Sequence, residues 1–232
     1  MKAEKLEIKI KTLENQIRTL QDIHAIETLQ RAYGYYLERW MAQEIIDLFS
    51  DGPGVVLYFN GEGSFLGKEG VARYFNHVES LPELMHQVMQ VSGIVDVAPD
   101  GKTAKGRWYG YGKLVLPEGG GVNQQQPMSG IYEMEYVKEN GVWKIKVLRF
   151  NGLWGFKSKE GFVKPERIAA IDPNNPHINP APDSLPEIPP QNTHYPSGYI
   201  FPFHYKHPVT GKDTSENEWN ESLGLAPKKK VK

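Results

Sequence analysis

His86 is the residue whose type and position best suit chemistry. It opens a segment in which His86, Val88, Gln90 and Ser92 alternate with their neighbours, so in a β-strand they would share one face. An acidic residue of a predicted helix, Glu38, precedes it in the chain. An imidazole and a carboxylate that face one apolar cavity can transfer a proton without a metal or an organic cofactor. The sequence therefore predicts a proton-transfer site with no cofactor and no metal.

Other chemistries have weaker support. His204 and His207 are three residues apart, but they lie in an irregular, proline-flanked segment with no nearby acid, so we expect no metal there. The run Gly119-Gly120-Gly121 lacks the strand and helix that flank a phosphate-binding loop.

Charge and composition limit the expected partners. The chain has 232 residues with 27 basic and 28 acidic side chains, and no predicted element collects a basic face that could follow a phosphate backbone. Nucleic acid is therefore not an expected partner. No apolar run is long enough to cross a membrane, and residues 1–11 lack the apolar stretch of a signal peptide. The absence of cysteine excludes disulfides and thiolate chemistry, and we expect a cytoplasmic protein.

The first 22 residues carry a heptad pattern. Apolar residues recur at alternating spacings of four and three, the pattern of a coiled coil: Leu6, Ile10, Leu13, Ile17 and Leu20. This predicts a homo-oligomer, a trimer or a dimer. The alternative is that the stripe packs on the body of its own chain.

Helices precede strands in the remainder of the pattern. Helices are expected from residue 23 past Tyr36, at 42–49 and at 68–78. Strands are expected at 55–59, 65–67, 85–97, 103–116, 129–138 and 142–150, with a longer loop at 117–127. This order predicts an α+β fold in which a curved antiparallel sheet wraps around the N-terminal helices.

Residues 156–232 differ in composition from the rest. Twelve of the seventeen prolines lie between Pro165 and Pro227, which disfavours a sheet or a long helix. The segment is nevertheless rich in aromatic residues, so we expect an ordered arm that lies across its own domain or a neighbouring subunit. The alternative is a disordered tail, above all beyond Gly211. Three parts are thus expected: a coiled-coil-like helix (1–22), a domain (23–155) and the arm (156–232).

Four short segments of the predicted domain carry a family resemblance. They are YGYYLE with DLFSD within 33–51, LGKEG at 66–70, the strand that His86 opens, and NGVWKI at 140–145. In this order they resemble the SnoaL-like family of the nuclear-transport-factor-2-like (NTF2-like) superfamily, dehydratase and lyase members included. The resemblance implies a cone-shaped fold with a deep apolar cavity.

The resemblance also implies roles for particular residues. In dehydratase-type members a histidine at the position of His86 transfers the proton, and an aspartate at the position of Glu38 orients it. The acid here is one methylene longer. Tyrosines near the positions of Tyr36 and Tyr58 hold a substrate oxygen in such relatives, which makes these two residues candidate hydroxyl donors.

Strand alternation and aromatic content add further candidates. Trp143, Ile145 and Val147 share one face of the last strand, so Arg149 and Asn151 are expected to continue that face inward. A buried Arg149 would pair with an acid such as Glu38 or bind a substrate oxygen, or the strand bulges and Arg149 reaches solvent. Trp40 and Tyr109 belong to a set of aromatic residues of which a minority should line the cavity.

These features together predict a cofactor-independent lyase. Its substrate would be a bulky aromatic or polycyclic small molecule, and the resemblance admits either loss of water or retro-aldol-like release of formaldehyde from lignin-derived diaryl compounds. His86 would transfer the proton, with Glu38 or Arg149 setting its orientation and charge. Two alternatives remain: a noncatalytic binding or assembly module, and an isomerase or cyclase with the same site.

Overall fold

The computed structural model describes residues 2–60, 62–77, 84–117, 123–157, 200 and 203–224. The helices are α1 (Lys2–Glu38), α2 (Ala42–Asp47), α3 (Gly67–Phe75) and α4 (Glu216–Ser222). The strands are β1 (Val56–Phe59), β2 (Gly63–Leu66), β3 (Met85–Val97), β4 (Thr103–Pro117), β5 (Asn123–Glu139) and β6 (Val142–Gly155). None of the described helices combines the length and apolar character that crossing a bilayer demands.

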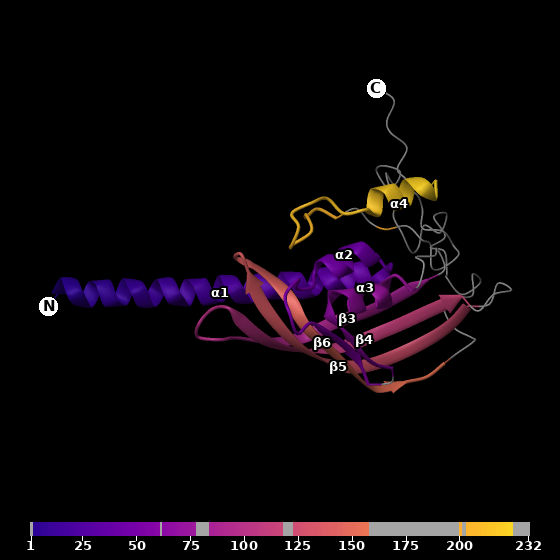
Figure 1. Cartoon of the computed structure of the whole chain (residues 1–232), viewed down its shortest axis with the longest axis horizontal. Coiled ribbons are helices and arrows are strands. Elements are labelled where there is room, and N and C mark those ends of the chain that lie inside the picture. The colour runs from indigo at the N-terminus through magenta and orange to yellow at the C-terminus, as the bar shows by residue number, and fades with distance from the viewer. Residues whose placement is uncertain are drawn as a thin grey trace, which may run out of the picture.

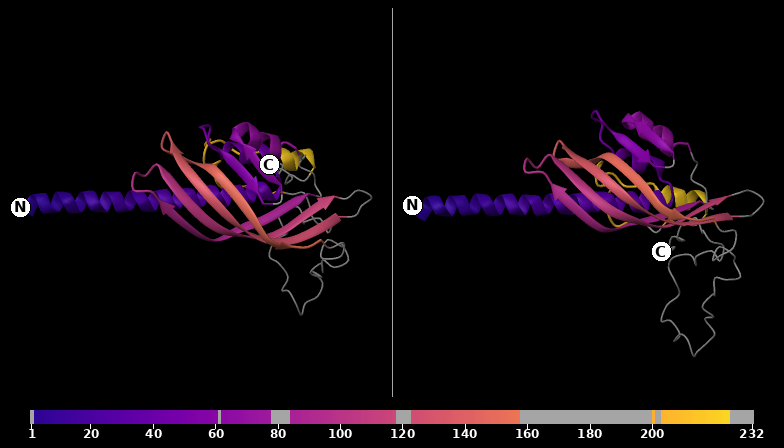
Figure 2. Two further views of the ribbon diagram at one scale, coloured as in Figure 1. Left: turned by 60° about the horizontal axis from the view of Figure 1, so that its bottom comes forward. Right: turned by 90° about the horizontal axis from the view of Figure 1, so that it is seen from below.

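One curved six-stranded sheet forms the body, in the order β2-β1-β6-β5-β4-β3 (Figures 1 and 2). The predicted α+β fold, with a curved sheet and an N-terminal helix against it, is confirmed. One pairing differs from the expected antiparallel sheet, because β1 runs parallel to β6 with Leu57 opposite Leu148. The pairing with β6 starts upstream of β1, because Phe49, just after α2, forms a parallel bridge with Ile145. The expected loop at 117–127 is also shorter, because β5 begins at Asn123, opposite Pro117.

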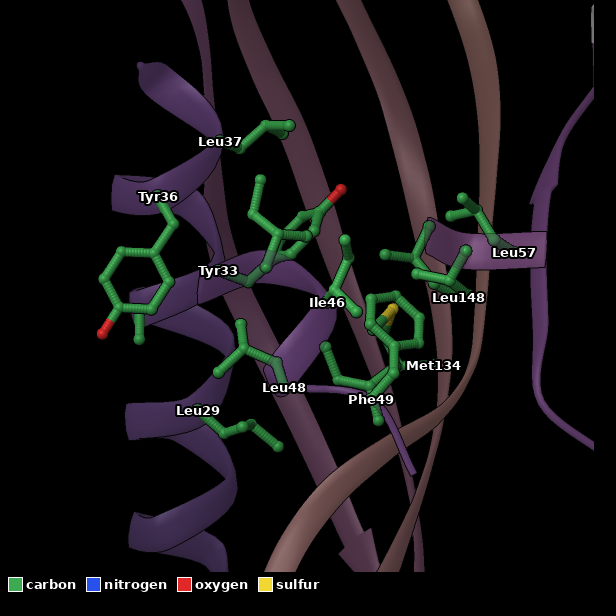
Figure 3. Close-up of a cluster of buried hydrophobic side chains, with 14 of the residues drawn as sticks. Leu29, Tyr33, Tyr36, Leu37, Ile46, Leu48, Phe49, Leu57, Met134 and Leu148 are labelled. Carbon is green, nitrogen blue, oxygen red and sulfur yellow. The ribbon is translucent and has the colours of Figure 1, made fainter. Parts of the chain in front are cut away.

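The core lies between α1 and the sheet. Figure 3 shows Leu29 and Tyr33 of α1 directed toward the strands, where they meet Phe49 and the sheet residues Met134 and Leu148. Burial of such aliphatic and aromatic side chains is the main stabilising contribution to a domain of this size. This face of α1 therefore fixes the helix against the sheet.

Asp22 marks the point at which α1 joins the body. Its buried carboxylate accepts hydrogen bonds from Lys138 Nζ at 2.5 Å and from Trp143 Nε1 at 2.9 Å. Every residue from Ala3 to Gln21 is exposed, and Figure 1 shows this half of the helix extending well past the sheet. One continuous helix thus has a free half and a packed half.

The end of α1 holds Trp40 in an unusual backbone conformation. Trp40 N donates to Leu37 O at 3.1 Å and Met41 N to Tyr36 O at 3.0 Å, the pair of bonds of a Schellman motif. The motif places Trp40 at φ +54°, a region that usually favours glycine. The indole is buried, and its Nε1 donates to Phe75 O at 2.7 Å. The helix end therefore fixes the direction of this ring.

The described part of the C-terminal arm packs against α1 and α2. His207 Nε2 hydrogen-bonds to Glu44 O at 2.8 Å, and its ring stacks on Tyr36 with centroids 5.4 Å apart. Ser215 N donates to Glu44 Oε1 at 2.9 Å, just before α4. Residues 212–224, beyond Gly211, thus take part in ordered structure. Three of the aromatic residues that make the arm rich in rings, Tyr195, Tyr199 and Phe201, lie outside the described residues.

Candidate active site

A cavity of about 490 Å³ opens between the end of α1, α3 and the concave side of the sheet. This volume lies in the range of small-molecule sites. Its wall is rich in aromatic residues, among them Tyr33, Phe59, Tyr74, Phe75, Tyr132 and Phe150. Its polar side chains include His86, Glu62, Asn60 and Gln126. Such a wall suits a largely apolar, ring-containing ligand with a few polar atoms.

His86 lines this cavity from the start of β3. Its imidazole stacks on the Trp40 indole, with centroids 5.6 Å apart and planes 17° from parallel. Among the described residues, none hydrogen-bonds to the imidazole nitrogens. Burial lowers the pKa of His86 to about 4, because the apolar surroundings penalise the charged ring. At neutral pH His86 is therefore a neutral imidazole that can accept a proton.

This low pKa makes the stability of the fold depend on pH. A histidine in an unfolded chain has a pKa of about 6.5. Between about pH 6.5 and 4, His86 is therefore protonated in the unfolded chain but neutral in the folded protein. The stabilisation is fully present above that window and is lost as the pH falls through it. We expect the free energy of unfolding to fall by about 1–3 kcal/mol more in the wild type than in His86→Gln between about pH 7 and 4. Urea unfolding at both pH values measures the difference, and equal losses would contradict it.

Tyr33 and Tyr132 face each other across the cavity wall. Their ring centroids are 6.2 Å apart in an edge-on arrangement, and their hydroxyls are hydrogen-bonded. Burial raises the pKa of Tyr132, whereas its hydrogen bonds with Gln90 and Tyr33 act in the opposite direction. Bonds that favour the phenolate are those in which its oxygen accepts. Both contributions therefore have the direction expected where the Tyr132 oxygen accepts.

Glycines in the strands make room for this wall. A Cβ atom on Gly110 would lie 2.7 Å from Cε2 of Tyr132 and 2.8 Å from Cε2 of Phe150. Tyr132 and Phe150 themselves pack at a centroid distance of 4.7 Å. The absence of a side chain at Gly110 therefore lets both rings lie against the sheet.

Glu38 is not brought to His86. It is half-buried in a separate shallow hollow beside Gln87 and Met89, and its carboxylate lies 4.0 Å from Arg39. The helical period explains this: Tyr33 and Leu37 line the cavity, and Glu38 is rotated about 100° further round the helix. The prediction that Glu38 orients His86 through a hydrogen bond is therefore wrong. The acidic side chain that does line the cavity is Glu62.

Arg149 is exposed, so the expectation that it points inward is wrong. It pairs with Glu135 on the outer side of the sheet, with Nη1 and Oε1 3.5 Å apart. The cause is a β-bulge: Glu135 is opposite Val147 and Tyr136 is opposite Ile145, which leaves Lys146 as an extra residue. Beyond the bulge, the residues of β6 that face inward are those that strict alternation from Trp143 would place outward.

Leu148 and Phe150 are consequently the buried residues of the second half of β6. Asn151, expected to face inward with Arg149, is half-buried and does not line the cavity. The structure has the other arrangement that the sequence allowed, in which β6 bulges and Arg149 reaches solvent.

The aromatic candidates divide between the cavity and other sites. Trp40 contacts the site through its stack on His86. Tyr36 points from α1 away from the strands (Figure 3), and its neighbours are Phe203 and His207 of the arm. Tyr109 is 52% exposed. Tyr58 does not line the cavity, whereas its neighbour Phe59 does.

Sequence reasoning missed Tyr132, Tyr33 as a named ligand contact, and Glu62. A signal for Tyr132 existed: Tyr132, Met134 and Tyr136 alternate with Glu133 and Glu135, which predicts an inward face for the tyrosines. Glu62 follows a turn and belongs to no periodic pattern. Among the described residues, no three histidine or carboxylate side chains form a group that could hold a metal ion.

Comparison with known proteins identifies the family of this chain. A profile of the SnoaL-like domain matches residues 18–149, which is more than half of the chain. The chain belongs to the SnoaL-like family. This SnoaL-like domain covers α1 from within its free half through most of β6, and so includes the elements that carry His86, Tyr33 and Tyr132. No curated protein matches the sequence.

Solved structures agree with this family at the level of the fold. A type 2 hexachlorocyclohexane dehydrochlorinase is 20% identical at a TM-score of 0.52, covering 62% of this chain and 93% of its own. A type 3 dehydrochlorinase from Novosphingobium barchaimii is also 20% identical, at a TM-score of 0.51 with 62% and 94% covered. An NTF2-like superfamily protein from Salmonella enterica is 16% identical, at a TM-score of 0.50 with 62% and 99% covered. This SnoaL-like protein therefore has the NTF2-like fold.

Proposed function

We propose that this protein is a lyase that uses acid–base chemistry at His86 on an aromatic or polycyclic small molecule, without a cofactor. The observation that carries the proposal is a neutral, half-buried imidazole on the wall of a cavity rich in aromatic residues. A neutral imidazole can act as a base, and its conjugate acid can then return the proton to a leaving group. Proteins with this fold include the hexachlorocyclohexane dehydrochlorinases named above, so the fold can house an elimination site.

The proposed reaction begins with proton transfer from the substrate to His86. In a dehydration, the proton comes from carbon, the C–H electron pair forms the new double bond, and the C–O bond breaks. The hydroxide that leaves takes the proton back from the imidazolium and departs as water. In a release of formaldehyde, the proton comes from a CH₂OH group, and the C–C bond breaks as the carbonyl forms. The carbanion left on the substrate takes up the proton.

Tyr132 is the hydroxyl donor in this proposal. Its side chain lies on the cavity wall, and its hydrogen bonds with Gln90 and Tyr33 lower its pKa, as bonds that the oxygen accepts do, so we assign its proton to a ligand oxygen. A hydrogen bond to a developing oxyanion or leaving oxygen stabilises the transition state most where water is excluded. Negative charge there also stabilises the imidazolium of His86, which compensates for the desolvation that lowers its pKa.

Mass spectrometry of product mixtures tests the proposal. Hydroxylated diaryl and polycyclic compounds, including ones that carry a CH₂OH group, are incubated with the wild type and with His86→Gln. We expect a product lighter by one water or one formaldehyde, formed by the wild type and not by the variant. A product of unchanged mass would instead identify an isomerase or cyclase. Binding without any product would favour a noncatalytic module.

A further inference from the structure

The free half of α1 has an apolar surface that the proposed chemistry does not use. We call it the heptad stripe: Leu6, Ile10, Leu13, Ile17 and Leu20. The exposed fractions of these five residues lie between 47% and 66%. Nothing in the described part of the chain covers them. A row of five exposed aliphatic side chains is typical of a surface that binds a partner.

The body of the same chain cannot be that partner while α1 is one helix. The side chains with which α1 contacts the sheet, such as Ile26 and Tyr33, lie about 180° around the helix from the heptad stripe. The residues that continue the stripe alongside the body, His24, Arg31 and Tyr35, are exposed as well. The alternative in which the stripe packs on its own domain is thereby excluded for the described residues. A second helix could approach along this whole face.

We propose that the heptad stripe binds the same stripe of a second copy of this chain, in a parallel, in-register, two-stranded coiled coil. Ile10 and Ile17 take the a positions of the heptad, and the three leucines take the d positions. In parallel coiled coils, isoleucine at a with leucine at d favours two strands over three or four. The pattern thus specifies a dimer.

The flanking charges favour the parallel orientation. Lys9 occupies a g position and Glu14 the following e position. A parallel pair of helices places Lys9 of each copy beside Glu14 of the other, an attractive contact. An antiparallel pair would set g against g and e against e, so that Lys9 would meet Gln16 and Glu14 would meet Glu7. Opposite charges therefore meet only when both helices run in the same direction.

The short length of the stripe is compatible with a stable pair. Isolated helices of this size are marginal because the first turn is costly to form. Here the packed half of α1, from Asp22 onward, already supplies that nucleus. The free half only has to extend a helix that exists.

Light scattering on the full chain tests the number of copies. At micromolar concentration we expect the wild type at twice the chain mass of 26.3 kDa, and the double variant Ile10→Glu with Ile17→Glu at the single-chain mass. The matched control is Ile8→Glu, which changes a 63% exposed isoleucine outside the stripe and keeps the wild-type mass. A monomeric or trimeric wild type, or a double variant that keeps the wild-type mass, overturns the proposal. Circular dichroism checks that the variants fold.

A disulfide cross-link tests the orientation, since the chain has no cysteine of its own. In the parallel pair, two copies of Leu6→Cys face each other and form a covalent dimer under mild oxidation. In an antiparallel pair a d residue faces an a residue, so Leu6 would lie opposite Ile17, and the two introduced thiols would be about 16 Å apart along the helices, beyond the reach of a disulfide. Ile8→Cys, outside the stripe, is the control that should not cross-link. Absence of cross-linking in Leu6→Cys, with the dimer mass retained, refutes the parallel arrangement.

Discussion

Replacing His86 by glutamine is expected to lower kcat by about 10²–10⁴-fold, the usual contribution of a general base or acid. Glutamine has nearly the size of histidine and keeps a polar group at the cavity wall, but it cannot take a proton from the substrate. Because the substrate's other contacts lie on the aromatic wall, KM should change much less than kcat. Initial rates on the compound found by mass spectrometry give both constants.

Two further measurements make this result specific to His86. His77→Gln changes an exposed histidine that does not line the cavity, and it should leave kcat unchanged. The pH dependence of kcat/KM should show the low pKa of His86, so that activity is retained well below pH 6.5 and falls toward about pH 4. A His86→Gln variant with more than about a tenth of the wild-type rate would exclude the imidazole as the proton-transfer group.

Tyr132→Phe is the second variant with a large expected effect. It removes the proposed hydroxyl donor and leaves the aromatic ring in place. Loss of one donor to a developing oxyanion lowers kcat by about 10²–10³-fold in enzymes that use one. We expect a decrease of that size in kcat, measured with the same substrate as for His86.

Tyr109→Phe is the matched control for Tyr132→Phe. It removes the same hydroxyl from a residue that is 52% exposed, so the rate should not change. Thermal unfolding of both variants separates a catalytic effect from a loss of stability, because deletion of a hydrogen-bonded hydroxyl also costs about 1 kcal/mol. Equal rates for Tyr132→Phe and wild type would remove Tyr132 from the mechanism.

The sequence was sufficient where a single local pattern decides the outcome. The 3.6-residue period of α1 and the alternation that begins at His86 depend on side chains close in the chain, and the structure has both elements. The cone-shaped α+β fold followed from their order and from the family resemblance. The same alternation placed His86 toward the cavity that it lines, although it holds only as far as Gln90, because a register shift after Val91 leaves Ser92 exposed.

The misplaced candidates and Glu62 depend on features without a local signal. Arg149 and Asn151 were misplaced because the bulge at Lys146 is visible only in the pairing of β6 with β5. Glu38 was misplaced because one helical step separates it from Leu37, and the sequence does not show which of the two meets the cavity. Glu62 came into the site through the turn between β1 and β2. The positions of these residues could be determined only from the three-dimensional structure.

The extra residue in β6 also determines which side chains of this strand face the cavity. Phe150 lines the chamber and Arg149 meets solvent solely because Lys146 is one residue more than the partner strand needs. Removing that residue would turn the far half of the strand over and exchange an apolar wall for a guanidinium and an amide. The same sequence of side chains would then form a receptor for anions. The chemical character of this cavity is thus set by strand register as much as by residue identity.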